Sequence, residues 1–128
     1  MKYALLIYSP ATAEEYAAVA TAAPGARVRD GEWAEYARAA REAGVLVAAE
    51  QLTHSETATS VRVRDGGERL ITDGPFMETK EHLLGFFLVD VPDLDAALDW
   101  AARMPAARIG TVEVRAAVSG MAWQRALD

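Results

Sequence analysis

Residues 83–118 read LLGFFLVDVPDLDAALDWAARMPAARIGTVEVRAAV, which predicts a strand, a helix and a second strand in succession. Residues 83–91 form the most apolar run of the chain, and such a run is typical of a buried strand. The helix follows Pro92 and ends at Pro105, because proline interrupts helical hydrogen bonding. Residues 111–118 then form the last strand. The helix is expected to face the core with four apolar residues at helical spacing, Leu94, Ala97, Leu98 and Ala101.

The N-terminal part of the chain predicts the same alternation of strand and helix. Residues 2–8 are expected to form the first strand, and residues 45–49 form a second, buried one. A capping-box pattern predicts a short helix over residues 13–22. A longer helix is expected over residues 31–43, where aromatic and alanine side chains recur on one face. Together these elements form a second strand–helix–strand unit.

A hairpin is predicted between the two units, after a polar connection over residues 54–59. Residues 61–64 and 69–71 are short strand segments, and the Asp-Gly-Gly turn at residues 65–67 joins them. Without this hairpin the element order is βαββαβ, the ferredoxin-like arrangement of the α+β class. We therefore predict a ferredoxin-like fold with an inserted β-hairpin and an antiparallel sheet.

The open face of that sheet predicts a homodimer. A ferredoxin-like sheet has helices on one face, so its other face must be covered or exposed. Face-to-face pairing of two copies would cover it and form a dimeric α+β barrel. The alternative is a monomer that leaves this face in solvent.

Length and composition restrict the remaining possibilities. The 128 residues are expected to form a single domain, 1–128, with residues 119–128 as a C-terminal tail. The net charge of −6 argues against direct nucleic-acid binding and against anionic membranes. The chain has no cysteine, which excludes disulfides and thiolate chemistry. Because no segment is apolar enough for a leader or a membrane span, a cytoplasmic location is expected.

The loop over residues 73–80 is one candidate site. Its Gly-Pro pair predicts a turn, and Phe76 is expected to pack against the body and hold the loop down. Asp73, Glu78 and Lys80 would then lie around a fixed bend, where binding groups are often found. The alternative is that Asp73 only bonds the turn backbone while Lys80 is a surface charge.

The last strand is the second candidate site. Because side chains alternate across a strand, Glu113 and Arg115 should share one face while Val112 and Val114 share the other. On a face that lines a dimer barrel, this acid and base could orient a ligand or tune a proton donor. The same pattern also suits a solvated strand face or a salt bridge between subunits.

Other kinds of chemistry have little support. His54 and His82 are the only histidines, so we predict no metal site. No Gly-x-Ser-x-Gly, dinucleotide or P-loop pattern occurs, and we predict no cofactor. A serine mechanism would need a dedicated base, which the sequence does not indicate.

Within residues 73–86, DGPFMETKEHLLGF, the positions 73–76, 78–81 and 84–86 resemble the signature of the DGPF-motif branch of the YciI-related proteins. The resemblance covers nearly all of the chain and is densest from residue 58 to residue 118. It implies a ferredoxin-like fold and a dimeric α+β barrel. It also implies that five residues at motif positions have functional roles: Asp73, Glu78, Lys80, Glu113 and Arg115.

The resemblance has a limit at the first long helix. YciI proteins in the narrower sense carry a histidine there, paired with an aspartate in a proposed acid–base dyad. This chain has Glu32, Trp33 and Glu35 in that region and no histidine, so the dyad does not transfer. The resemblance therefore does not decide whether this chain is an enzyme. Proteins of the DGPF branch are often encoded beside extracytoplasmic-function sigma factors, so the resemblance also implies a regulatory association as an alternative.

Two functions follow as hypotheses. In the first, a small anionic molecule binds in a cleft of the dimer barrel, where Asp73, Glu78 and Glu113 transfer protons. Lys80, Arg115 and Phe76 would hold that molecule. In the second, the chain is a non-enzymatic binding or regulatory module linked to sigma-factor control, because a fold alone does not define a reaction.

Overall fold

A computed structural model of the chain describes residues 1–9, 28, 31–76, 81–118 and 122–127. The predicted helix over residues 13–22 lies outside this part. The described elements are, in chain order, β1 (Lys2–Ser9), α2 (Glu32–Glu42), β2 (Leu46–Gln51), the 3-10 helix η1 (Ser55–Thr57), β3 (Thr59–Val63), β4 (Arg69–Asp73), β5 (His82–Asp90), α3 (Leu94–Arg103), the 3-10 helix η2 (Pro105–Arg108), β6 (Thr111–Ala116) and α4 (Ala122–Leu127).

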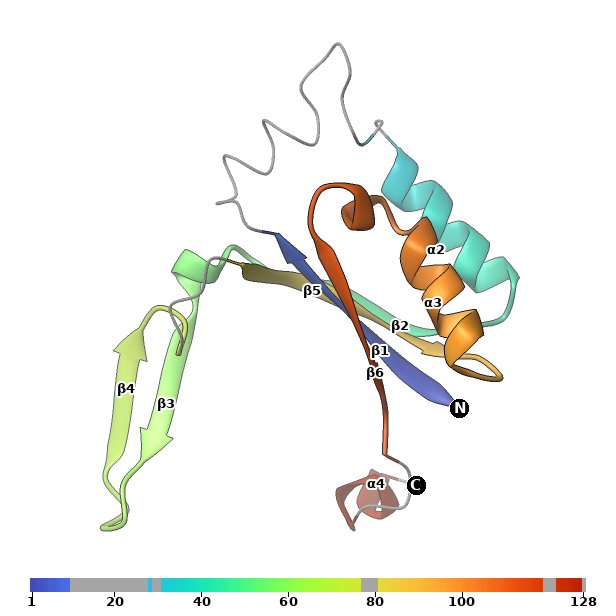
Figure 1. Ribbon diagram of the computed structural model, residues 1–128. Coiled ribbons are helices and arrows are strands. Elements are labelled where there is room, and N and C mark those ends of the chain that lie inside the picture. The colour runs from blue at the N-terminus through green and yellow to red at the C-terminus, as the bar shows by residue number, and fades with distance from the viewer. Residues whose placement is uncertain (10–27, 29–30, 77–80, 119–121, 128) are drawn as a thin grey trace.

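The main sheet has four strands in the order β2-β5-β1-β6, and every neighbouring pair is antiparallel. Helices α2 and α3 lie side by side on one face of this sheet (Figure 1). The structure therefore confirms a mixed α+β domain with an antiparallel sheet. No helix in the described part of the chain combines the length and the apolarity needed to cross a membrane.

The core lies between the sheet and these two helices. On β1, buried and half-buried residues alternate, and the buried set is Tyr3, Leu5, Ile7 and Ser9. This alternation arises because successive side chains of a strand point to opposite faces. Phe87 and Val89 on β5 complete the central layer. The other face of the sheet carries the half-buried residues of the same strands.

Helix α3 meets the core through a different face from the one predicted. Ala97 and Ala101 are buried, as expected, but Leu94 and Leu98 are about half exposed. Small side chains occupy the closest approach to the sheet, and Trp100 fills the space beside them. The prediction was wrong for Leu94 and Leu98. Fewer residues of this short helix face the sheet than its apolar spacing suggests.

Gly85 is required where β5 passes β2. A Cβ atom at this position would lie 2.5 Å from the backbone oxygen of Glu50, much closer than carbon and oxygen atoms can approach. The conflicting atom belongs to the backbone, so a rotamer change could not relieve the conflict. The glycine therefore permits the close pairing of these two strands.

The hairpin β3–β4 forms a sheet of its own, which confirms the predicted hairpin. It projects away from the four-stranded sheet (Figure 1). Val61, Val63 and Ile71 are all exposed on it. A two-stranded hairpin is at best marginally stable in water by itself. Its apolar residues therefore remain available to another surface.

Helix α4 was not predicted and lies within the segment expected to be a tail. Its Trp123 and Leu127 side chains are strongly exposed. In Figure 1 it lies apart from α2 and α3. This short helix therefore adds apolar surface outside the core.

Tyr36 is expected to make the stability of the protein depend on alkaline pH. Burial raises its pKa from 10.0 to about 12, and nearby Arg103 opposes this rise. Its hydroxyl donates a hydrogen bond of 2.8 Å to the carbonyl oxygen of Trp100. Because the folded state prefers the neutral phenol, this contribution is complete below pH 10 and is lost as pH rises towards 12.

Urea unfolding of Tyr36→Phe across this range tests the expectation. The variant should lose roughly 1 kcal/mol at neutral pH, since it lacks the hydrogen bond. It should also lose less stability than the wild type between pH 10 and pH 12. If the free energy of unfolding fell equally with pH in the two proteins, Tyr36 would not be the cause of the alkaline loss of stability.

Candidate functional site

The helix-free face of the main sheet brings charged and apolar side chains into rows. Cross-strand pairing places Phe86 of β5 beside Leu6 of β1, and Leu6 beside Glu113 of β6. The neighbouring row contains Leu88, Ala4 and Arg115, paired in the same way. These side chains share a face because they alternate with the buried residues of their strands. We call this surface the open face.

Glu113 and Arg115 therefore lie on the open face, at its β6 edge. The predicted alternation of this strand is confirmed, since Val112 and Val114 pack against the core cluster on the other side. Opposite residues of neighbouring strands have Cβ atoms about 4.5–5.5 Å apart. Each charged side chain thus borders an apolar one, Leu6 for Glu113 and Ala4 for Arg115.

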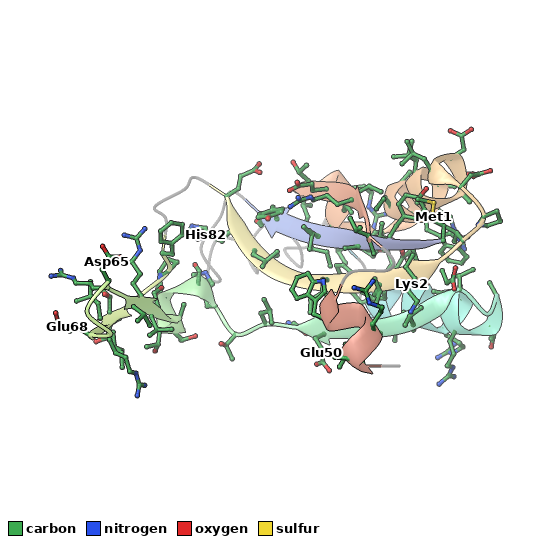
Figure 2. The ribbon with its side chains drawn as sticks, turned by 90° about the horizontal axis from the view of Figure 1, so that it is seen from below. Met1, Lys2, Glu50, Asp65, Glu68 and His82 are labelled. Carbon is green, nitrogen blue, oxygen red and sulfur yellow. The ribbon has the colours of Figure 1, made fainter. Side chains whose placement is uncertain are left out.

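Glu50 is a member of this face that the sequence analysis missed. It pairs with Phe86 and so ends the same row, at the β2 edge of the sheet. Figure 2 labels Glu50 on β2. The predicted strand ended at residue 49, whereas β2 continues to Gln51. Extending the strand by two residues would have placed Glu50 two positions after Ala48, on the same face.

Asp73 and Phe76 lie at the base of the hairpin, outside the main sheet. Asp73 is exposed and pairs with Thr59 at the end of β4. The predicted turn is present: Gly74 has a φ of +97°, which favours glycine, and its N–H donates to the Ala58 carbonyl. The side chain of Ser60 also donates to the Gly74 carbonyl, at 2.8 Å. The turn is thus attached to the beginning of β3.

Phe76 does not anchor its loop in an apolar pocket of the chain, so this expectation was wrong. The side chain is 67% exposed, and the Arg62 guanidinium lies 5.0 Å from the centre of its ring. The hairpin projects away from the four-stranded sheet, and Phe76 is not a member of the core cluster. A cation–π contact takes the place of burial.

The predicted site residues of the loop and of β6 belong to different parts of the structure. Glu78 and Lys80 lie outside the described residues. Asp73 belongs to the hairpin, while Glu113 and Arg115 belong to the four-stranded sheet. A cleft shared by the loop and β6 therefore stays a prediction.

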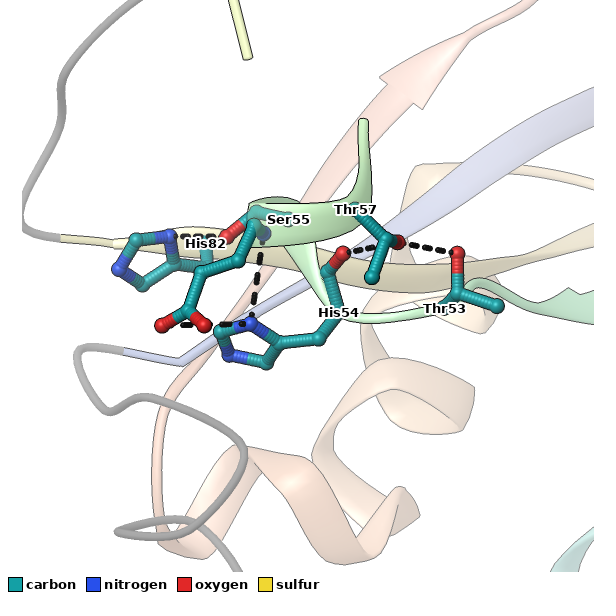
Figure 3. A network of polar contacts seen from close by, with 6 residues as sticks. Thr53, His54, Ser55, Thr57 and His82 are labelled. Carbon is teal, nitrogen blue, oxygen red and sulfur yellow. Dashed lines mark hydrogen bonds and ion pairs between the residues drawn. The ribbon is translucent and has the colours of Figure 1, made fainter. Parts of the chain in front are cut away.

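A further polar cluster lies where η1 meets the first residue of β5 (Figure 3). The hydroxyl oxygen of Ser55 and Nδ1 of His82 are 2.7 Å apart, and both residues are half-buried. The His54 ring lies 5.7 Å from that of His82, measured between centroids. His54 Nδ1 accepts a hydrogen bond from the Glu56 backbone, while its Nε2 is buried and has no partner in the described structure.

No sequence signal indicated this cluster. Ser55 and His82 are 27 positions apart, on either side of the hairpin, and no pattern in the sequence pairs them. Among the described residues, no group of three or more His, Cys, Asp or Glu side chains could hold a metal ion.

A known protein family matches most of the chain. Residues 1–119 match the family described as the YCII-related domain. An uncharacterised protein of Rhizobium meliloti (strain 1021) is 45% identical over 76 residues. This match spans 58% of the chain and 60% of that relative, which is less than two thirds of the relative's length.

Proposed function

The chain belongs to the YCII-related domain family, and from this premise we propose that it binds a small anionic molecule between two copies of itself. Within the family we assign it to the DGPF-motif branch, on the strength of residues 73–86. We also propose a ferredoxin-like fold, which the strand order β2-β5-β1-β6 supports. Pairing of two open faces would then form a dimeric α+β barrel.

The apolar centre of the open face supports this assembly. Leu6, Phe86 and Leu88 lie on neighbouring strands there, on the side away from α2 and α3. Burying apolar surface contributes roughly 25 cal/mol per Å², so a second copy would gain by covering them. The exposed apolar residues of the hairpin and of α4 would supply further contact area.

One observation carries the functional proposal: Glu113 and Arg115 share the open face with that apolar centre. Between two sheets these charged groups would be partly removed from water, where electrostatic interactions are stronger. The Arg115 guanidinium can bind a carboxylate through two parallel hydrogen bonds. Glu113 would then lie two residues away, able to accept or donate a proton. Asp73, Glu78 and Lys80 would complete the site from the loop.

Ligand binding by matched arginine variants tests the proposal. Small keto acids and hydroxy-aromatic acids, such as pyruvate and salicylate, would be screened by thermal shift and binding constants measured by calorimetry. Arg115→Gln should weaken binding about 10-fold or more, because hydrogen bonds to charged groups contribute about 1.5–3 kcal/mol. Arg38→Gln is the control, since Arg38 is exposed on α2, across the sheet from the open face. Equal affinities for both variants would exclude Arg115 from the site.

Glu113→Gln separates an enzyme from a binding module. If the bound molecule is converted, the variant should keep its fold and lose about 10²–10⁴-fold in rate, the usual effect of one general acid–base group. A binding or regulatory module would bind the molecule and show no turnover in either protein. That result would favour the non-enzymatic function, including an association with sigma-factor control.

A further inference from the structure

The contact between Ser55 and His82 places a hydroxyl against an imidazole nitrogen. Their Oγ and Nδ1 atoms are 2.7 Å apart, within the hydrogen-bond range that proton transfer requires. In the tautomer that carries its proton on Nε2, His82 accepts the hydroxyl proton through Nδ1. A free serine hydroxyl is a weak nucleophile, and an adjacent base is the usual means of activating it.

The surrounding structure holds both side chains in position. His82 begins β5 and pairs with Ser9 of β1, so its backbone belongs to the main sheet. Ser55 begins η1, whose turn is closed by the bond from the Thr57 N–H to the His54 carbonyl. The Thr57 hydroxyl also donates to Thr53, at 2.8 Å (Figure 3). A nucleophile and a base on fixed elements need little rearrangement before reaction.

Access and surroundings are also compatible with chemistry. Ser55 and His82 are both half-buried, so a reagent can reach them from solvent. The second imidazole, from His54, lies beside that of His82. The other described serine near the hairpin, Ser60, directs its hydroxyl to the Gly74 carbonyl and has no imidazole partner. Ser55 is thus distinguished from Ser60 by its base.

We propose that Ser55 is an activated nucleophile towards acyl donors such as activated esters, with His82 as its general base. Ser55 Oγ attacks the carbonyl carbon while its proton passes to His82 Nδ1. The bond to the leaving alcohol then breaks, and His82 returns the proton to that alcohol. Water attacks the resulting acyl-serine and gives a proton to His82. His82 passes this proton to Ser55 Oγ as the bond from Oγ to the acyl carbon breaks, and the carboxylic acid is released.

This proposal is independent of the anion site on the open face. Ser55 and His82 lie at η1 and the beginning of β5, whereas Glu113 and Arg115 lie on β6. Arg38→Gln, at an exposed position of α2 that belongs to neither site, should leave serine reactivity unchanged. The binding test of the anion site and the labelling test of Ser55 can therefore fail separately.

A biotin-linked fluorophosphonate tests the nucleophile directly on the full chain. Ser55 Oγ would form a bond to phosphorus, fluoride would leave, and the serine proton would pass to His82. Peptide mass spectrometry of the labelled wild-type protein should locate the adduct on Ser55. An unlabelled wild type, or an adduct on another residue, would overturn the proposal. This experiment uses the wild-type protein, so it remains informative even if a Ser55 variant fails to fold.

Substitutions then distinguish two roles of His82: a general base for Ser55, or a partner that only holds Ser55 by a hydrogen bond. Ser55→Ala should abolish labelling, while Ser60→Ala should leave it unchanged. In His82→Asn, an amide group replaces Nδ1, so a hydrogen bond to Ser55 can persist without a base. Labelling should become about 10²-fold slower or more, as for loss of one general base. With the fold verified by circular dichroism, labelling of His82→Asn at the wild-type rate would overturn the role of His82.

Discussion

Leu5→Ala is expected to lower the free energy of unfolding by about 2–5 kcal/mol, the range for truncating a fully buried leucine. Leu5 has no exposed surface. Its strand β1 lies between β5 and β6, where Leu5 pairs with Phe87 and Val114. Removing the Cγ methine and the two Cδ methyl groups there would leave a cavity, because residues on both sides belong to the paired sheet.

Urea unfolding monitored by circular dichroism would measure the change. Both proteins would be compared at one concentration, because any association makes apparent stability depend on concentration. Leu98→Ala is the matched control, since Leu98 is 45% exposed on α3. Its loss should be clearly smaller, as expected of a partly solvated side chain. Equal decreases in the free energy of unfolding for Leu5→Ala and Leu98→Ala would contradict the placement of Leu5 in the core.

Phe86→Glu is expected to convert the proposed dimer into monomers. Phe86 lies on the open face between Leu6 and Glu50. A carboxylate at this position would have to be buried without a partner when two faces meet, and the effective cost is several kcal/mol per ion. Each 1.4 kcal/mol changes an equilibrium constant tenfold, so the dissociation constant should rise by about 10²-fold or more.

Light scattering at micromolar concentration would measure the mass. The wild type should give twice the chain mass of 13.8 kDa, and the variant should give the single-chain value. Leu94→Glu is the control because Leu94 is half exposed on α3, on the other side of the sheet. It should remain dimeric. A monomeric wild type would refute the barrel assembly, and a dimeric Phe86→Glu would place the contact on another surface.

Local pattern was sufficient to predict most elements of the described structure. The apolar run over residues 83–91 became β5, and Pro105 ends α3 as expected. The Asp-Gly-Gly turn joins β3 and β4. These signals depend on neighbours within a few residues, where turn chemistry and the strand period act directly. The alternation that places Glu113 and Arg115 on one face is also a local property of β6.

Predictions that required knowledge of distant surfaces were less successful. Phe76 was expected to enter a pocket, but the projection of the hairpin leaves no core beside it. Leu94 and Leu98 fit a helical stripe, yet α3 contacts the sheet through Ala97 and Ala101 instead. Periodicity indicates that a helix has an apolar side, whereas packing decides which residues of that side are buried.

The sequence by itself determined the order of strands and helices, the position of the hairpin and the residues that share each strand face. These features follow from backbone geometry, in which the side-chain period is set within a single element. Only the tertiary structure decided that Glu50 completes the row containing Glu113, and that Ser55 meets His82 across 27 positions. Such contacts depend on strand register and on chain reversal at the hairpin, and no spacing along the sequence encodes them.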